Sequence, residues 1–250
     1  MSEVLRIGTW NVEYADNAGT NARRQEVMHH CPADIWILTE THDDLTPGGD
    51  YVAVHSFQRP LHGRRVKQQS RWVSIWSRHP IVTRICLPCA DLERTVVALI
   101  AAPLGPLLVY GTVMPWHDDK GRMGERKFAA NWSEHHRVAP QQAREWEALY
   151  SLLPDAALIV AGDYNTDMDS GALYGTKRGI EIVREGFDRC GLYCATQALA
   201  SISGLALPPI DHIAVPKVWK KRVSLAYAWE GKVGSPRLSD HSGIVISVPI

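Results

Sequence analysis

The sequence predicts an α/β fold in which two β-sheets lie against each other with helices on their outer sides. About ten short apolar runs, many rich in Val and Ile and bounded by Gly, Pro or Asp, are typical of buried strands. Helical patterns are fewer and fall between these runs, which favours sheets flanked by helices. The chain has 250 residues and no Pro/Gly/Ser-rich linker, so we expect one domain over residues 1–250.

The expected strands are distributed along the whole chain. They cover Val4–Trp10, Ile35–Thr39, Tyr51–His55, Trp72–Trp76, Val96–Ala101, Leu107–Val113, Leu158–Ala161, Ile210–Val215, Val223–Ala228 and Gly243–Val248. Four tryptophans, Trp10, Trp36, Trp72 and Trp76, lie inside these runs, and we therefore expect them in the core.

The clearest helical pattern covers Pro140–Leu153. Its apolar stripe is formed by Ala143, Trp146, Tyr150 and Leu153. Pro140 suits the first helical turn, because its missing N–H would have no partner there, and Pro154 ends the helix. Ala22–His30 and Ile180–Arg189 give weaker helical patterns.

Composition argues against several classes of protein. The formal net charge is zero and the pI is about 7.2, so no whole-surface attraction to nucleic acid is indicated. No apolar run is long enough to cross a membrane, and the N-terminal residues lack the apolar segment of a signal peptide. Five cysteines are a sparse, odd count that is typical of thiols in a reducing compartment. We expect a cytoplasmic protein, and the sequence does not indicate its oligomeric state.

Acidic and amide side chains follow several of the expected strands. Asp163 comes just after the apolar run Leu158–Ala161, and Asn165 lies two residues further on. Glu40 ends another apolar run, and Asn11 follows the first strand. We expect these residues to meet because all of them lie at the carboxyl ends of strands.

The C-terminal Ser239-Asp240-His241 and the more central Asp211 add a histidine and further carboxylates, which we expect at carboxyl ends of strands as well. Cleavage of a phosphate ester needs a cation on the phosphoryl oxygens, a base for water, and donors for the developing charge. Magnesium prefers oxygen ligands and keeps several waters, so one or two acids with an amide suffice. Taken singly, each of these residues is as easily a turn, cap or surface residue. Their combination favours a metal-assisted phosphoesterase.

Six short motifs together resemble the endonuclease/exonuclease/phosphatase superfamily, which includes DNase I, exonuclease III-like repair enzymes, sphingomyelinases and inositol polyphosphate 5-phosphatases. The motifs are Thr9-Trp10-Asn11, Ile37-Leu38-Thr39-Glu40, Val73–Ile81, Gly162-Asp163-Tyr164-Asn165, Ile210-Asp211-His212-Ile213 and Leu238-Ser239-Asp240-His241. The Gly-Asp-x-Asn and Ser-Asp-His motifs, in this order, are the most specific. The resemblance covers nearly the whole chain and implies a DNase I-like four-layer α/β sandwich of two packed mixed sheets flanked by helices.

The resemblance also implies a metal site. Glu40 would be the principal carboxylate for Mg²⁺ or Mn²⁺, with Asn11 and Asp240 completing or flanking the site. Asp163 would orient or deprotonate the attacking water.

Three further residues would act on the phosphate, according to the same resemblance. Asn165 would donate a hydrogen bond to it. His241 would stabilise the phosphoryl charge, and Asp211 would hold the imidazole of His241 in its tautomer and orientation.

The chain departs from the family pattern at two positions. Thr39 stands where most relatives have Gln before the metal glutamate. Relatives also carry a His or Tyr phosphate donor on the strand before Gly-Asp-x-Asn, where this chain has Thr112 or Val113. Either the donor role is weakened, or His117 or an arginine of a neighbouring loop replaces the missing donor.

Two long loops are candidates for substrate contact. Phe57–Arg71 is basic and includes Arg64 and Arg65, and Trp116–His136 begins with Trp116 and His117. Each loop is as well explained by simple exposure to solvent as by ligand binding.

The substrate is the least determined feature. We expect a phosphodiesterase and rank nucleic acid first, by analogy with simple family members. The alternative is a phosphomonoesterase for a soluble or lipid phosphate, such as an inositol phosphate, or a sphingomyelinase-like enzyme. A catalytically silent binding module is a second alternative, which the retained acids disfavour.

Overall fold

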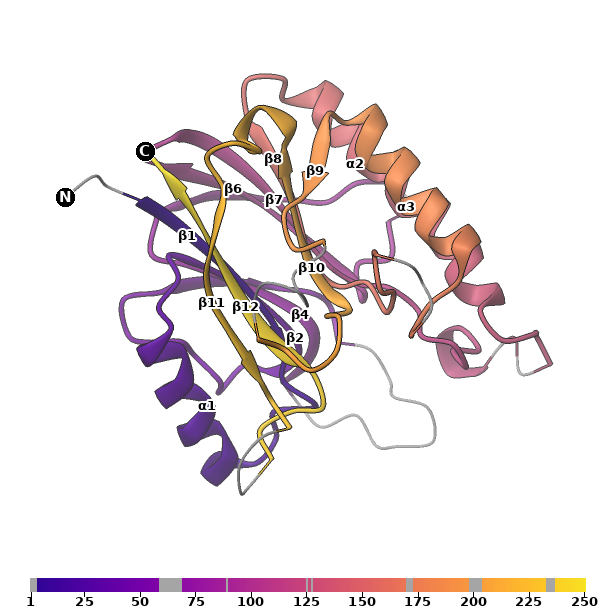
Figure 1. The fold of residues 1–250 in the computed structure, drawn as a ribbon, viewed down its shortest axis with the longest axis horizontal. Helices are drawn as coiled ribbons and strands as arrows, with labels where there is room; N and C mark the ends of the chain where they lie inside the picture. The colour runs from indigo at the N-terminus through magenta and orange to yellow at the C-terminus, as the bar shows by residue number, and fades with distance from the viewer. Residues whose placement is uncertain are drawn as a thin grey trace.

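The computed structural model describes residues 4–58, 69–88, 90–124, 126, 128–169, 173–197, 204–232 and 237–250. Within these residues, twelve strands form two six-stranded mixed sheets, and three α-helices cover the outer faces of the sheets (Figure 1). The predicted α/β sandwich with four layers is therefore confirmed. No helix of the described part is long and apolar enough to cross a membrane.

The first sheet contains the N- and C-terminal strands side by side. Its members are β11 (Ser224–Glu230), β12 (Ser242–Pro249), β1 (Val4–Asn11), β2 (Ile35–His42), β4 (Ser70–Ser77) and β3 (Val52–His55), in this spatial order. Strands β1 and β2 are parallel, and all other neighbours in this sheet are antiparallel. The parallel pair brings the carboxyl ends of β1 and β2 to one edge.

The second sheet has the same mixed character. Its members are β5 (Ile81–Ile85), β6 (Thr95–Ala102), β7 (Gly105–Val113), β8 (Ala157–Asp163), β10 (Asp211–Pro216) and β9 (Leu192–Cys194), in this order. All ten predicted strands are present, and β5 and β9 are the two that the sequence analysis missed. Both are edge strands. In β5, Thr83 and Arg84 interrupt the apolar residues, and β9 has only three residues, so neither gives a long apolar run.

Three apolar clusters hold the four layers together. The largest lies between the sheets, and two smaller ones lie under the helices. Helix α1 (Ala18–His30) covers the first sheet, and α2 (Ser133–Leu152) and α3 (Lys177–Arg189) cover the second (Figure 1). The four tryptophans predicted to be core residues are all buried. Short 3₁₀ turns cover Arg122–Gly124 and Lys217–Trp219.

Helix α2 corrects the sequence prediction. We expected the helix to begin at Pro140, but it begins at Ser133, and Pro140 lies in its interior. Residues of the extra turns are buried, with Glu134 2% and His135 0% exposed, and Glu134 forms ion pairs with two arginines. This tertiary packing offsets the helical hydrogen bond that a proline cannot donate. The last residues of the expected loop Trp116–His136 therefore belong to a helix.

Candidate active site

Five strand ends meet at one edge of the two sheets. Asn11 ends β1 and Asp163 ends β8, as predicted, and Glu40 lies near the end of β2. Asp211 instead begins β10, and His241 directly precedes β12, so the expectation that all these residues lie at carboxyl ends is wrong. Because β10 and β12 run antiparallel to β8 and β1, their starts reach the same edge, and Asp211 is directly opposite Asp163.

A cavity of about 530 Å³ opens at this edge. Among the described residues, its acidic members are Glu13, Glu40, Asp163, Asp211, Glu230 and Asp240. Its cationic members are Lys232 and His241. The apolar part of its wall includes Trp116, Leu173, Leu207 and Pro208. The cavity therefore combines a strongly acidic floor with an apolar wall.

Asp163 is the centre of a hydrogen-bond network. Asn165 donates to it twice, from its backbone N to Oδ1 at 2.8 Å and from Nδ2 to Oδ2 at 3.0 Å. Nδ2 of Asn11 donates to the same Oδ2 at 3.1 Å and to Glu40 Oε1 at 3.1 Å. The two amides thus fix the directions of two carboxylates.

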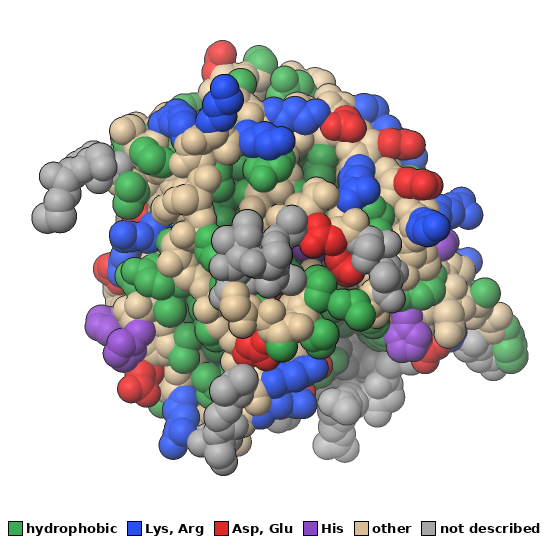
Figure 2. Space-filling model, viewed as in Figure 1, with side chains coloured by type: hydrophobic (Ala, Val, Ile, Leu, Met, Phe, Trp, Pro, Cys, Tyr) green, Lys and Arg blue, Asp and Glu red, His purple; other side chains and the backbone are tan. Residues whose placement is uncertain are grey.

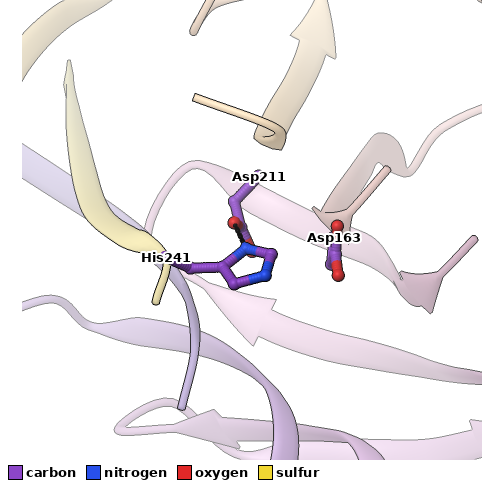
Figure 3. Close-up of side chains that lie close together, drawn as sticks. All are labelled: Asp163, Asp211 and His241. Carbon is purple, nitrogen blue, oxygen red and sulfur yellow. Dashed lines mark hydrogen bonds and ion pairs between the residues drawn. The ribbon is translucent and has the colours of Figure 1, made fainter. Parts of the chain in front are cut away.

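His241 is held by Asp211 through a short contact. Its Nδ1 lies 2.6 Å from Asp211 Oδ2, and in Figure 3 the ring lies between Asp211 and Asp163 with its second nitrogen on the Asp163 side. Burial alone would lower the pKa of His241, but the charges of Asp211 and Asp163 outweigh it and raise that pKa to about 10. The imidazole is therefore a cation at neutral pH.

The segment before His241 is anchored to the first strand. Ser239 Oγ donates to the carbonyl of Asn11 at 2.6 Å and accepts from the backbone N of His241 at 3.0 Å. The indole N–H of Trp10 donates to the His241 carbonyl at 3.3 Å. The Ser-Asp-His motif thus fixes the position of the imidazole against β1.

Glu40 has an uncommon backbone conformation, with a φ of 47° in the left-handed region. Burial raises its pKa to about 7, against the effect of the hydrogen bond from Asn11. Burial also raises the pKa values of Asp163 and Asp211, and the neighbouring carboxylates add to this. These carboxylates crowd one another around one imidazolium, so the site favours an additional positive charge.

The donor atoms of the site fit a hard divalent cation. Asp163, Asp211 and His241 offer ligand atoms that all lie within 4.8 Å of one another. Asp211 Oδ1 is buried and has no hydrogen-bond partner within the part of the chain that the structure describes. Because His241 is protonated beside Asp211, the oxygen atoms of Glu40, Asp163 and Asp211 are the better ligands. Asp240 is 46% exposed and lies beside His241, with 3.8 Å between Oδ1 and Nε2.

The predicted substrate-contacting residues divide into three cases. Trp116 lines the cavity and stacks on Trp72, with ring centroids 5.8 Å apart. His117 is exposed and lies outside the residues that line the cavity. Arg64 and Arg65 lie outside the described residues.

A buried ion pair that the sequence analysis missed supports Trp116. The guanidinium of Arg94 lies 5.4 Å from the ring of Trp72 and 6.0 Å from that of Trp116, and it pairs with buried Asp119. Asp119 in turn accepts from the backbone N of Gly121 at 2.8 Å. The Arg94–Asp119 pair therefore holds the segment that begins at Trp116 beside the cavity. Only the fold brings these residues together, because their sequence spacing carries no pattern.

The strand position expected to carry a phosphate donor carries none. Thr112 Oγ1 donates to Gln142 Oε1 at 2.9 Å on the helix side of the sheet, and Val113 is buried between the sheets. Tyr174, from the loop between β8 and α3, does line the cavity, and the sequence analysis missed it. A lone tyrosine in a loop gives no sequence signal.

Charged side chains elsewhere are mixed in sign. Among the described residues on the face shown in Figure 2, basic and acidic side chains alternate over the outer helices. Arg189 and Lys217, for example, pair with Glu147 and Asp188. Over the helices on this face, the described charged side chains therefore carry both signs.

The sequence was compared with protein families and with curated proteins. A family model described as "Endonuclease/Exonuclease/phosphatase family" matches residues 8–241. No curated protein matches the sequence.

Solved structures with a similar fold include two nucleic-acid enzymes. The 3'-5' exonuclease NExo from Neisseria meningitidis has a TM-score of 0.66 and 15% identity, with 98% of this chain and 100% of that chain covered. An AP endonuclease from Archaeoglobus fulgidus has a TM-score of 0.67 and 15% identity, with the same coverage. A NExo structure described as a 3' phosphatase bound to product DNA hairpin has a TM-score of 0.69, 15% identity and again the same coverage. At this identity the likeness shows the fold.

Proposed function

Because the chain belongs to the endonuclease/exonuclease/phosphatase family, we propose that it is a divalent-metal-dependent phosphoesterase that hydrolyses P–O bonds by in-line attack of water. The observation that carries this proposal is the convergence of Glu40, Asp163, Asp211 and His241 on one cavity. Three carboxylates beside a cationic imidazole suit the hydrolysis of a phosphate ester, because negative charge develops on the phosphoryl and leaving oxygens.

Each residue has a role that follows from its contacts. Asp163, oriented by Asn11 and Asn165, is placed to hold or accept a proton of the attacking water. His241, kept cationic by Asp211, is placed to stabilise the negative charge on the phosphoryl oxygens.

Oxygen atoms of Glu40, Asp163 and Asp211 would hold Mg²⁺ or Mn²⁺, with Asp240 at the edge of the site. Bound there, the cation neutralises charge on the phosphoryl group. Without it, the excess of carboxylates would repel a phosphate.

We propose a phosphodiester as the substrate and rank nucleic acid first. The apolar wall formed by Trp116, Leu173 and Leu207 beside the acidic floor suits a sugar or base next to the phosphate. The structural neighbours act on nucleic acid according to their descriptions, as a 3'-5' exonuclease and an AP endonuclease. The neighbour described as a 3' phosphatase favours one second candidate, a phosphomonoester at the end of a nucleic acid.

A substrate panel tests the reaction and the substrate class together. Single-stranded, duplex and abasic oligonucleotides, a 3'-phosphorylated oligonucleotide, an inositol phosphate and a phosphocholine ester are incubated with Mg²⁺, Mn²⁺ or EDTA. We expect metal-dependent cleavage of at least one oligonucleotide, and loss of that cleavage in Asp163→Asn. Turnover of only the inositol phosphate and the phosphocholine ester would exclude the nuclease and keep the phosphoesterase.

Glu40 tests the metal site in particular. Glu40→Gln keeps the shape of the side chain and removes its charge, so we expect most Mg²⁺ binding and turnover to be lost while the fold remains. Glu26→Gln on the exposed side of α1 is the matched control. Wild-type turnover by Glu40→Gln with the same Mg²⁺ dependence would contradict the assignment.

We also propose a cytoplasmic location. The described cysteines, Cys31, Cys86, Cys190 and Cys194, are all free thiols, which is the state maintained by a reducing compartment.

A further inference from the structure

The cavity is rich in hydrogen-bond acceptors, and its amide donors are already engaged. Nδ2 of Asn11 donates to Glu40 and Asp163. Nδ2 of Asn165 donates to Asp163 at 3.0 Å and to the carbonyl of Met114 at 2.9 Å. A bound phosphate only accepts hydrogen bonds, so it needs donors beyond these two amides.

The strand that borders β8 does not supply such a donor. The hydroxyl of Thr112 is committed to Gln142, on the side of the sheet that α2 covers. Val113, the next residue, has an apolar side chain and is 0% exposed. Besides the imidazolium of His241, a further donor for the phosphate therefore has to come from another element.

Tyr174 provides a hydroxyl at the cavity from the loop that follows β8. Its backbone carbonyl accepts from Asp167 N at 2.8 Å, which closes the loop. Its ring makes edge contacts with Trp132, at 5.2 Å between centroids, and with His117, at 6.2 Å. The adjacent Gly175 has a φ of 112°, which side-chain-bearing residues rarely adopt, and so helps to define this turn. The ring is thus held from two sides.

Both contacts of the Tyr174 hydroxyl with His117 are long. The oxygen accepts from the backbone N of His117 at 3.5 Å, and the O–H lies 3.4 Å from His117 Nδ1, so a phosphoryl oxygen at ordinary hydrogen-bond distance would be the better acceptor. Burial raises the pKa of Tyr174, and the negative charges of Asp163 and Asp240 add to the effect. The phenol is therefore protonated at neutral pH and lies within electrostatic reach of both carboxylates.

We propose that Tyr174 is a catalytic residue that donates its phenolic O–H to a non-bridging oxygen of the phosphoryl group. This rests on the proposed function of the site and deepens it. His117, which the sequence analysis considered for this role, has an exposed imidazole, and its backbone N–H instead donates to the Tyr174 hydroxyl. The donor lost from the strand is thereby supplied by a loop.

Tyr174→Phe tests the proposal, because it keeps the ring and its contacts with Trp132 and removes the hydroxyl. We expect kcat on the best substrate of the panel to fall roughly 10- to 100-fold, the effect of losing one hydrogen bond to a charged group, with a smaller change in KM. Tyr150→Phe, the same change on the exposed side of α2, is the matched control and should leave kcat at the wild-type value.

A second readout works without turnover. The affinity for inorganic phosphate in the presence of Mg²⁺ is measured by calorimetry, and Tyr174→Phe should weaken it about 10-fold. Weaker phosphate binding in that variant, with no hydrolysis by the wild-type protein, would support the donor and overturn the proposed function. Unchanged kcat and unchanged phosphate affinity in Tyr174→Phe, with Asp163→Asn inactive, would overturn the donor alone. A wild-type protein that binds no phosphate would overturn the donor as well.

Discussion

Two histidines on opposite sides of strand β10, the half-buried His241 and the buried His212, differ in their state of protonation. His241 faces the cavity beside Asp211, and its pKa is raised to about 10. His212 is the next residue after Asp211, but successive side chains of a strand point to opposite faces. Burial lowers its pKa to about 4.

The partners of the two rings explain the difference. His212 lies between a hydroxyl and a carbonyl, with Thr196 Oγ1 at 2.9 Å from Nδ1 and the Thr166 carbonyl at 2.9 Å from Nε2. A neutral imidazole that donates from Nε2 and accepts at Nδ1 satisfies both partners. A carboxylate would reverse the outcome, as Asp211 does for His241. The cavity side of β10 thus carries a charged histidine, and a layer of neutral histidines begins on the opposite side.

His135 extends the neutral layer. Its Nε2 lies 3.2 Å from the carbonyl of Tyr164, and burial lowers its pKa to about 4. Tyr164 lies between Asp163 and Asn165, so this uncharged histidine supports the backbone that carries Asp163. Its role is structural, whereas the role that we propose for His241 is chemical.

The largest effect is expected when the charged histidine is removed. His241→Ala removes the cation that faces the phosphoryl group, and kcat should fall by roughly two to four decades. His29→Ala at the exposed end of α1 is the control. Kinetics on the best oligonucleotide of the panel measure the effect, and a loss below about threefold would contradict the role of His241.

A smaller effect is expected when the partner of this cation is changed. Asp211→Asn keeps a hydrogen-bond acceptor near Nδ1 and removes a charge that raises the pKa of His241. That pKa should fall, so activity that depends on the imidazolium should be lost at a lower pH than in the wild-type protein. The pH–rate profile measures this shift. An unchanged profile would count against the pairing, and kcat near pH 6 should drop less than in His241→Ala.

The neutral histidine, His212, should make the stability of the protein depend on pH. The pKa of His212 is lower in the folded than in the unfolded protein, so the unfolded state binds more protons between about pH 6.5 and 4. The contribution is fully present above pH 6.5, and the free energy of unfolding should decrease as pH falls through this window.

Urea unfolding at pH 7 and pH 5 measures that dependence. His212→Gln, which cannot titrate, should lose about 1–3 kcal/mol at pH 7, because buried partners lose a hydrogen bond. The same variant should show a shallower decrease between the two pH values than the wild-type protein. Equal slopes in both proteins would show that His212 is not the titrating group.

The smallest effect concerns two arginines of the expected loop Phe57–Arg71. Replacing Arg64 and Arg65 together with alanine should raise KM more than it lowers kcat, because we expect them to bind substrate away from the scissile bond. The zero net charge of the chain also predicts a modest dependence of KM on salt. A larger change in kcat than in KM would instead place the two arginines at the reacting phosphate.

The sequence by itself determined the strands, the fold class and the acids of the site. Apolar runs and the Gly-Asp-x-Asn and Ser-Asp-His motifs are local patterns, and Asp163 and His241 follow from them directly. Core tryptophans could be predicted for the same reason, since burial follows from the apolar run around them. Edge strands such as Leu192–Cys194 escaped detection because a strand of three residues is too short to show a hydrophobic period.

Only the tertiary structure decided which side chains act together. Pro140 was placed at a helix start by its local preference, whereas buried contacts of Glu134 and His135 begin the helix earlier. The opposite charge states of His212 and His241, and the arrival of Tyr174 at the cavity, depend on partners far away in sequence. Local propensity acts over a few residues, but a pKa or a hydrogen bond depends on distances that the chain acquires when its two sheets pack together.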